Sequence, residues 1–187
     1  MTIINSDYQA QLVAMHSKGQ FIRGSKIFGS IQPFLTQYQP TSVLDFGCGH
    51  GALMTSIQQA YPDMRVEGYD PGNADHNCVP KRSFDAVVSA DVFEHIEPNH
   101  LAETLHMISN KMIVAGWFRI ACYPAKKHLP DGRNAHLIVE SPTWWREQLL
   151  ANMDITIVSQ EISVFDKSHK WPHVKGCNYD VTVLRVK

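Results

Sequence analysis

Apolar residues follow two different spacings along this 187-residue chain, and each change of spacing marks a structural element. They recur at helical spacing over 6–18 and 25–38, which predicts two helices ahead of the first strand. Short, mostly apolar runs then occupy 42–46, 65–69 and 84–89, and each has the length of a strand. The third run is rich in apolar and β-branched residues, as is typical of a parallel strand buried on both faces.

The rest of the chain continues the alternation of strands and helices. Helical spacing recurs in 51–61, 99–109 and 144–152. Strand-like runs recur in 111–123, 155–165 and 179–186. The last two strands have no helix between them, so they are most simply an antiparallel pair. The sequence therefore predicts an open α/β sheet, mostly parallel with an antiparallel C-terminal strand pair, and with helices on both faces.

Length and composition narrow the class of protein. The length suits a single domain over 1–187, with N-terminal helices in 1–40 and an α/β core in 41–187. The formal net charge of -1 gives no global basic field for nucleic acid, although a local basic patch is not excluded. No apolar run approaches the roughly 18 residues of a membrane span, and the N-terminus lacks a signal-like pattern. We therefore expect a cytoplasmic protein without a membrane partner.

Local chemistry concentrates where the first predicted strand ends. Asp45 is followed by glycines at every second position, 47, 49 and 51, and then by a predicted helix. Such glycines let a ligand approach the main chain, and the free amides at the start of a helix point at whatever is bound. Asp70 ends the second predicted strand, where an acid can accept hydrogen bonds from ribose hydroxyls. This arrangement indicates a nucleotide-like ligand.

Four features together resemble class I S-adenosylmethionine-dependent methyltransferases. They are VLDFGCGHG at 43–51, VEGYD at 66–70, FDAVVSADVFEHIEP at 84–98, and the terminal strand pair. The glycine spacing DxGxGxG differs from the GxGxxG of dinucleotide-binding dehydrogenases, and an acid at Asp45 would repel a pyrophosphate but attract an ammonium group. The resemblance implies a Rossmann-like sheet and S-adenosylmethionine as the cofactor.

The resemblance also places the cofactor. Asp45 would attract its ammonium group, loop amides its carboxylate, and Asp70 its ribose diol. The end of the third strand would line the methionine side, and the helices of 1–40 would form a lid. The expected cofactor-binding residues are Asp45, Phe46, Gly47, Cys48, Gly49, Asp70, Pro71, Ala90 and Asp91. The segment 73–83 is short, so Asp75 or Asn77 is only a weak candidate for an adenine contact.

Two polar clusters follow the later strands, where ligands sit in such sheets. The first is Asp91-x-x-Glu94-His95, and the second runs from Asp131 to His136 and precedes Trp144 and Trp145. The second resembles the substrate loop of ubiquinone-type O-methyltransferases. The expected catalytic residues are Glu94, His95 and His136, and the expected substrate-binding residues are Asp131, Arg133, Asn134 and Trp144. The remaining histidines, including His16, His50 and His106, are taken as structural or exposed by default.

A divalent metal is an alternative for the same residues. Small-RNA 3′-end 2′-O-methyltransferases show a similar pattern, in which Asp91, Glu94, His95 and His136 would be the ligands. Oxygen and imidazole ligands suit an ion that acidifies a hydroxyl. His95 or His136 could equally act without metal, as a base or by orienting the acceptor.

The expected function is methyl transfer from S-adenosylmethionine to a small-molecule or glycan-type acceptor at oxygen. One alternative is a metal-dependent RNA 2′-O-methyltransferase, which would need a basic face from Lys126, Lys127, Arg133, Lys167 and Lys170. An alternative of another class is a non-catalytic cofactor-binding partner subunit. The acceptor itself and the oligomeric state do not follow from the sequence.

Overall fold

A computed structural model describes residues 4–17, 26–166 and 175–186. Its six-stranded sheet has the order β2-β1-β3-β4-β6-β5. The strands are β1 (Ser42–Phe46), β2 (Arg65–Tyr69), β3 (Phe84–Ala90), β4 (Met112–Ala121), β5 (Ile155–Asp166) and β6 (Lys175–Arg185). β1 to β4 pair in parallel, and β6 is antiparallel to both β4 and β5. The predicted mixed sheet with an antiparallel terminal pair is confirmed.

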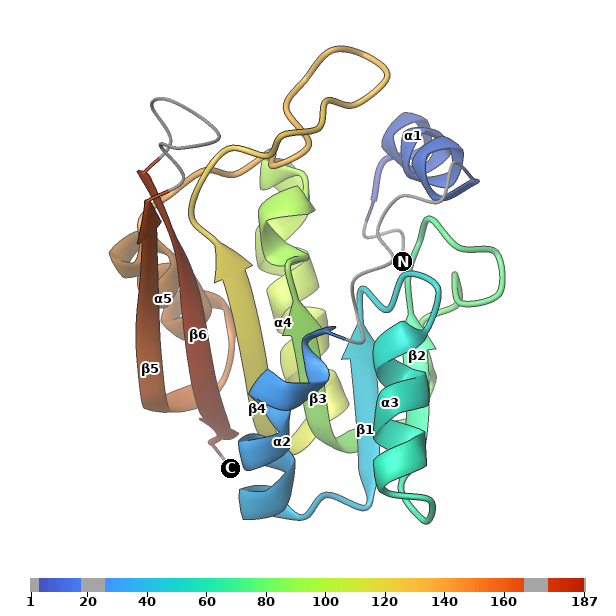
Figure 1. Cartoon of the computed structure of the whole chain (residues 1–187), viewed down its shortest axis with the longest axis vertical. Helices are drawn as coiled ribbons and strands as arrows, with labels where there is room; N and C mark the ends of the chain where they lie inside the picture. Colours follow the sequence, from blue (N-terminus) through green and yellow to red (C-terminus); the bar gives the residue numbers. More distant parts are fainter. Residues whose placement is uncertain (1–3, 18–25, 167–174, 187) are drawn as a thin grey trace.

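Helices cover both faces of the sheet (Figure 1). They are α1 (Ser6–Ser17), α2 (Phe28–Tyr38), α3 (Ala52–Ala60), α4 (Leu101–Lys111) and α5 (Pro142–Asn152), with short 3₁₀ turns η2 (Phe93–His95) and η3 (Pro98–His100). α2 and α3 lie on one face, and α4 and α5 on the other. α5 begins after Ser141, whose hydroxyl accepts a hydrogen bond from the Trp144 amide.

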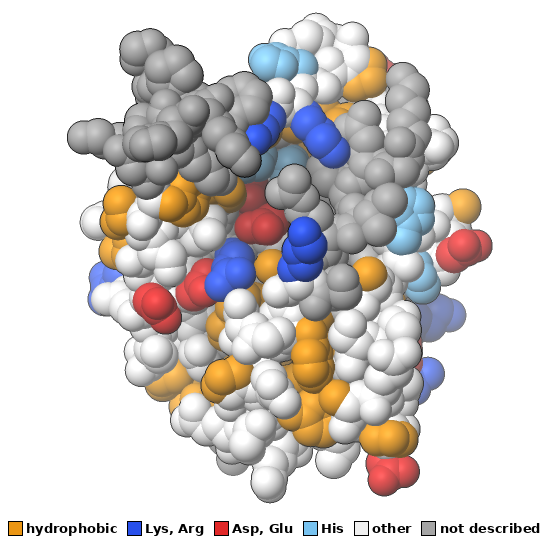
Figure 2. All heavy atoms as spheres, viewed as in Figure 1, with side chains coloured by type: hydrophobic (Ala, Val, Ile, Leu, Met, Phe, Trp, Pro, Cys, Tyr) orange, Lys and Arg blue, Asp and Glu red, His pale blue; other side chains and the backbone are white. Residues whose placement is uncertain are grey.

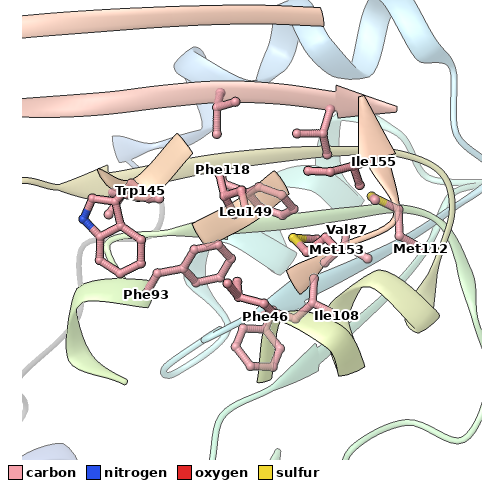
Figure 3. Packing of buried hydrophobic residues seen from close by; sticks show 14 of the residues in the cluster. Phe46, Val87, Phe93, Ile108, Met112, Phe118, Trp145, Leu149, Met153 and Ile155 are labelled. Atoms are coloured by element: carbon pink, nitrogen blue, oxygen red, sulfur yellow. The ribbon is translucent and has the colours of Figure 1, made fainter. Parts of the chain in front are cut away.

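The larger core lies between the sheet and helices α4 and α5 (Figure 3). Phe93 is almost completely buried, and its ring centroid lies 5.1 Å from that of Phe118 in β4. Trp145 is fully buried in the same cluster. Because Phe93 belongs to η2, this packing fixes the turn that carries Glu94 and His95 at the end of the sheet.

The two N-terminal helices have different surroundings. In α2, Ile31, Phe34 and Leu35 are buried against the sheet in the second core cluster, which α3 shares. α1 instead lies beyond the carboxyl ends of the strands and packs on the 125–137 segment, where Leu129 and Ala135 are buried with it. Of the helices in 1–40, α1 is therefore the one placed to cover a ligand. None of the described helices is long and apolar enough to cross a membrane.

The connection from β2 to β3 is short, as predicted. Residues 70–83 form turns and bends rather than a helix and a strand. β1 and β3 are neighbours in the sheet, and their following segments turn to opposite sides, with α3 after β1 and α4 after β3. Ligands bind at such a switch point in open α/β sheets.

Candidate functional site

A cavity of about 740 Å³ opens at the carboxyl ends of the strands, beneath α1. Its wall combines α1, the glycine loop, the turn after β2, the 90–97 segment and the 121–128 segment. Figure 2 shows Lys and Arg side chains around a hollow in the upper half of one face, with acidic and histidine side chains between them. The volume is typical of a site for a cofactor and a small ligand.

Asp45 contributes an acid to the floor of this cavity. It is 3% exposed, and one of its carboxylate oxygens is buried with no hydrogen-bond partner in the described part of the chain. Burial, and next the charge of Asp70, raise the pKa of Asp45 to about 7. A buried carboxylate oxygen that lacks a partner is costly, so the site is suited to a cationic ligand group that would supply one.

The glycine loop is held close to both neighbouring segments. The amides of Gly47 and Cys48 both donate to the Tyr69 carbonyl, at 2.7 Å and 3.1 Å. Gly47 has φ +83°, and a Cβ there would lie 2.2 Å from a Val92 methyl group. Only glycine therefore allows the loop to pack directly on the segment after β3.

Asp70 is also buried, and its two oxygens already have main-chain partners. Oδ2 accepts from the Gly49 amide at 2.9 Å, and Oδ1 accepts from the Gly72 amide at 2.8 Å. These bonds orient the carboxylate and leave further acceptor positions on each oxygen. Asp70 thus presents hydrogen-bond acceptors at the cavity wall.

Asp91 follows β3 in an uncommon backbone conformation. It has φ +56°, in the left-handed region that is rare for residues other than glycine, and its amide donates to the Arg119 carbonyl at 3.0 Å. Strained residues of this kind cluster at ligand sites. Asp91 lines the cavity between the glycine loop and the histidines.

Glu94, His95 and His136 meet at the far end of the cavity. The Glu94 carboxylate is completely buried, and neither of its oxygens has a hydrogen-bond partner among the described residues. Its Oε1 lies 3.9 Å from Nε2 of His136. Burial, and next the charge of Asp91, raise the pKa of Glu94 well above its usual range. The His95 and His136 rings are perpendicular, with centroids 4.8 Å apart.

Both imidazoles are held by backbone carbonyls. Nδ1 of His95 lies 2.7 Å from the Ala135 carbonyl, and Nδ1 of His136 lies 2.5 Å from that of Tyr123. A carbonyl can only accept, so each Nδ1 carries the hydrogen and each neutral ring has its lone pair on Nε2. Burial is the main reason that the pKa of His95 falls to about 3, so this ring is neutral at pH 7.

The same three residues could hold a divalent metal. One ligand atom from each of Glu94, His95 and His136 lies within 4.8 Å of the others. In metal sites, a ligating histidine usually donates its other ring N–H to a carbonyl or carboxylate, as Nδ1 of His95 and His136 does here. The two Glu94 oxygens, which have no hydrogen-bond partner among the described residues, are suited to an ion. The donor set therefore fits a metal.

The predicted site residues divide into two groups. All of the predicted cofactor residues, and Glu94, His95 and His136, line the cavity. The predicted substrate residues do not belong to the wall. Asp131 and Arg133 pair with each other at 2.7 Å, and Trp144 packs on the core beside Trp145. Asp75 and Asn77 are also outside the wall.

Asn134 has a structural position instead. Its Nδ2 donates to the Ala125 carbonyl, and its Oδ1 accepts from the amides of Ala125 and His136. These three bonds close the 125–136 loop and set the backbone from which His136 enters the cavity. The residue thus acts on the site through His136.

Residues of α1 also line the cavity, although no sequence motif predicted them there. Tyr8, Leu12 and His16 line the cavity, and His16 is 7% exposed. Lys126 and Lys127 also line it, although they had been considered only for a basic face. The α1 residues belong to no motif, and they reach the cavity only because the helix packs over it.

A family model described as a methyltransferase domain matches residues 21–167 of the chain. This match covers most of the chain, including the glycine loop and both ends of the cavity. The chain belongs to this methyltransferase family. The predicted methyltransferase class is thereby confirmed, and the family and fold support S-adenosylmethionine as the cofactor of this enzyme. Among curated proteins, no match was found.

Solved methyltransferases share the fold at low sequence identity. A 1,6-didemethyltoxoflavin-N1-methyltransferase from Burkholderia thailandensis, with its acceptor and S-adenosylhomocysteine bound, has a TM-score of 0.64 and 15% identity over 96% of this chain and 87% of that one. A coclaurine N-methyltransferase bound to N-methylheliamine and S-adenosylhomocysteine has a TM-score of 0.60 and 12% identity, over 84% and 72% of the two chains. At this identity the likeness establishes the fold of the present chain and does not identify its acceptor.

Proposed function

We propose that the enzyme transfers a methyl group from S-adenosylmethionine to a hydroxyl group of a small-molecule or glycan-type acceptor. The observation that carries the proposal is one continuous cavity that joins Asp45 and Asp70 to the Glu94–His95–His136 cluster. The two solved N-methyltransferases bind small acceptors in the same fold, which supports the small-molecule part of the proposal and not the choice of oxygen. A cavity that extends past the cofactor residues also argues against a non-catalytic partner subunit.

The cofactor half of the cavity has groups for each end of S-adenosylmethionine. The unpartnered oxygen of Asp45 would accept hydrogen bonds from the ammonium group, and Asp70 would accept them from the ribose diol. Ala90 and Asp91 would line the methionine chain between these acids and the acceptor. When bound, the cofactor supplies a methyl group on a cationic sulfur, so catalysis consists largely of alignment.

His136 is suited to take the proton from an acceptor hydroxyl. Its Nδ1–H is held by the Tyr123 carbonyl, so the lone pair on Nε2 is directed toward the side of the cavity where Glu94 lies. As the acceptor oxygen gains the methyl group, its proton passes to Nε2, and Glu94 stabilises the imidazolium. His95 would orient the acceptor. This chemistry favours oxygen acceptors of the kind used by ubiquinone-type O-methyltransferases.

The test has a binding arm and a transfer arm. We expect S-adenosylhomocysteine to bind the wild-type protein in calorimetry, and phenols or sugars to be methylated with release of that product. His136→Gln should lower kcat by about 10²- to 10⁴-fold and leave the affinity for S-adenosylhomocysteine unchanged. His106→Gln, at an exposed position of α4, is the matched control. An unchanged kcat in His136→Gln would show that His136 is not the general base. If S-adenosylhomocysteine does not bind the wild-type protein, the whole proposal is refuted.

Metal-assisted methylation of a ribose 2′-hydroxyl, as in RNA, is a second candidate. The observation that favours it is the close approach of the ligand atoms of Glu94, His95 and His136. A bound divalent ion would acidify the hydroxyl. Of the basic face that this reaction would need, Lys126 and Lys127 lie at the cavity wall. Lys167 and Lys170 lie outside the described residues.

Manganese separates the two candidates. If the second holds, paramagnetic resonance will show Mn²⁺ bound to the wild-type protein and not to Glu94→Gln, and a chelator will abolish methylation of a short RNA until Mn²⁺ is added. Full activity on small acceptors after chelation would favour the metal-free reaction.

A further inference from the structure

α1 contacts both walls of the cavity. On the acceptor side, the Tyr8 hydroxyl donates to the His95 carbonyl at 2.6 Å. Outside the cavity wall, Nε2 of Gln11 donates to Asp131 at 2.9 Å and ties α1 to the same loop. On the ribose side, Nε2 of Gln9 donates to the Pro71 carbonyl at 3.0 Å. The helix therefore bridges the two segments that the cofactor and the acceptor would touch.

The ribose side of this bridge depends on Gly72. A Cβ at Gly72 would lie 2.7 Å from Cδ2 of His16 and 2.9 Å from Cβ of Leu12. The helix thus packs directly on the backbone of the turn that follows Asp70. No larger residue fits there without moving α1, since the Leu12 contact is close to the helix backbone.

His16 brings a polar group to Asp70 itself. Its Nε2 lies 3.5 Å from Asp70 Oδ1, and the ring centroid lies 5.3 Å from that of His50 in the glycine loop. His16 is buried and lines the same cavity as Asp70. A ribose bound at Asp70 would consequently lie beside His16 and under α1.

We infer that His16 is a positioning residue of the cofactor site, which acts through Asp70, and that docking of α1 on Gly72 holds the bound cofactor in place. The inference rests on the proposed function, because it needs a cofactor ribose at Asp70. It predicts that S-adenosylhomocysteine leaves only when α1 lifts from the 70–72 turn. Product release then depends on α1 as well as on the glycine loop.

The first arm of the test places a methyl group under the helix. We expect Gly72→Ala to speed dissociation of S-adenosylhomocysteine about tenfold or more in stopped-flow measurements, because α1 can no longer dock. Gly29→Ala is the matched control, since a Cβ there meets nothing within 4 Å. Hydrogen exchange in residues 6–17 should slow on adding S-adenosylhomocysteine to wild type and Gly29→Ala, and much less in Gly72→Ala.

The second arm tests His16 with two substitutions of similar size. His16→Leu cannot donate to Asp70, and we expect its affinity for S-adenosylhomocysteine to fall about tenfold. His16→Gln keeps a donor and should recover part of the loss, with the thermal stability of the ligand-free protein alike in both. Should Gly72→Ala fail to fold, this pair still decides the question.

The outcomes are distinct. If wild type binds S-adenosylhomocysteine and all these variants bind and release it alike, the inference is overturned while the proposed function stands. Equal losses in His16→Leu and His16→Gln would overturn the role through Asp70. If wild type does not bind S-adenosylhomocysteine at all, both the inference and the proposed function are wrong.

Discussion

The cofactor end and the acceptor end of the cavity are assembled in different ways. The cofactor end is built from two short strand-to-turn segments, and its acids Asp45 and Asp70 lie directly at the ends of adjacent strands. The acceptor end joins residues from distant parts of the chain, with His136 reaching Glu94 across an irregular loop. Local motifs thus determine one end, while loop packing determines the other.

The two ends also handle buried charge differently. At the cofactor end, Asp45 is buried and one of its oxygens has no partner within the described residues. At the acceptor end, buried Glu94 is next to His136, which can take up a proton and balance its charge. The first arrangement favours binding a cation, and the second favours moving a proton. Substitutions at each end should therefore change different quantities.

The largest effect on cofactor binding is expected from Asp45→Asn. Losing a charged acceptor for the ammonium group should weaken S-adenosylhomocysteine binding roughly ten- to a hundredfold. Calorimetry at pH 8 would measure it. Asp63→Asn, the same change at an exposed position outside the cavity wall, is the control. An unchanged affinity in Asp45→Asn would show that the acid does not contact the ligand.

The same substitution has a pH signature in the ligand-free protein. Folding raises the pKa of Asp45 from 3.8 to about 7, so its favourable contribution is present at low pH and is lost as the pH rises toward 7. Above that pH the buried ionised group destabilises the fold. Asp45→Asn should therefore raise Tm more at about pH 8 than at about pH 5. In wild type alone, the affinity for S-adenosylhomocysteine should fall as Asp45 is protonated below about pH 7.

A smaller effect, confined to the acceptor end, is expected from Asn134→Ala. The change removes the three side-chain hydrogen bonds that Asn134 makes within the 125–136 loop, while the backbone bonds of the loop remain, so His136 is held less accurately. We expect kcat to fall about tenfold, because small displacements of a reacting group are costly. Binding of S-adenosylhomocysteine should be unaffected. Steady-state kinetics would measure the fall in kcat, with Asn110→Ala at the exposed end of α4 as the control. A loss of affinity for S-adenosylhomocysteine in Asn134→Ala would contradict the prediction.

The difference between a cofactor end built from local motifs and an acceptor end built by loop packing also explains which features the sequence could predict. The strand β2 was predicted at its observed bounds, and Asp45 and Asp70 were placed at the cavity, because strand periodicity and glycine spacing are local signals. Asp131 and Arg133 are polar residues in a loop, but they pair with each other outside the cavity wall. His16 reaches the cavity only because Gly72 lets α1 pack closely. Such contacts depend on tertiary packing, which no spacing in the sequence encodes.

Trp144→Ala should have the smallest effect on the reaction. Trp144 is half-buried against Trp145, with ring centroids 5.0 Å apart, and it is not part of the cavity wall. We expect a loss of about 1–3 kcal/mol of unfolding free energy from the missing packing and no change in KM or kcat. Denaturant unfolding and steady-state kinetics would measure both, with Leu150→Ala on the same helix as the control. A raised KM at unchanged stability would instead place Trp144 at the acceptor, as the sequence predicted, and would extend the acceptor end of the site to α5.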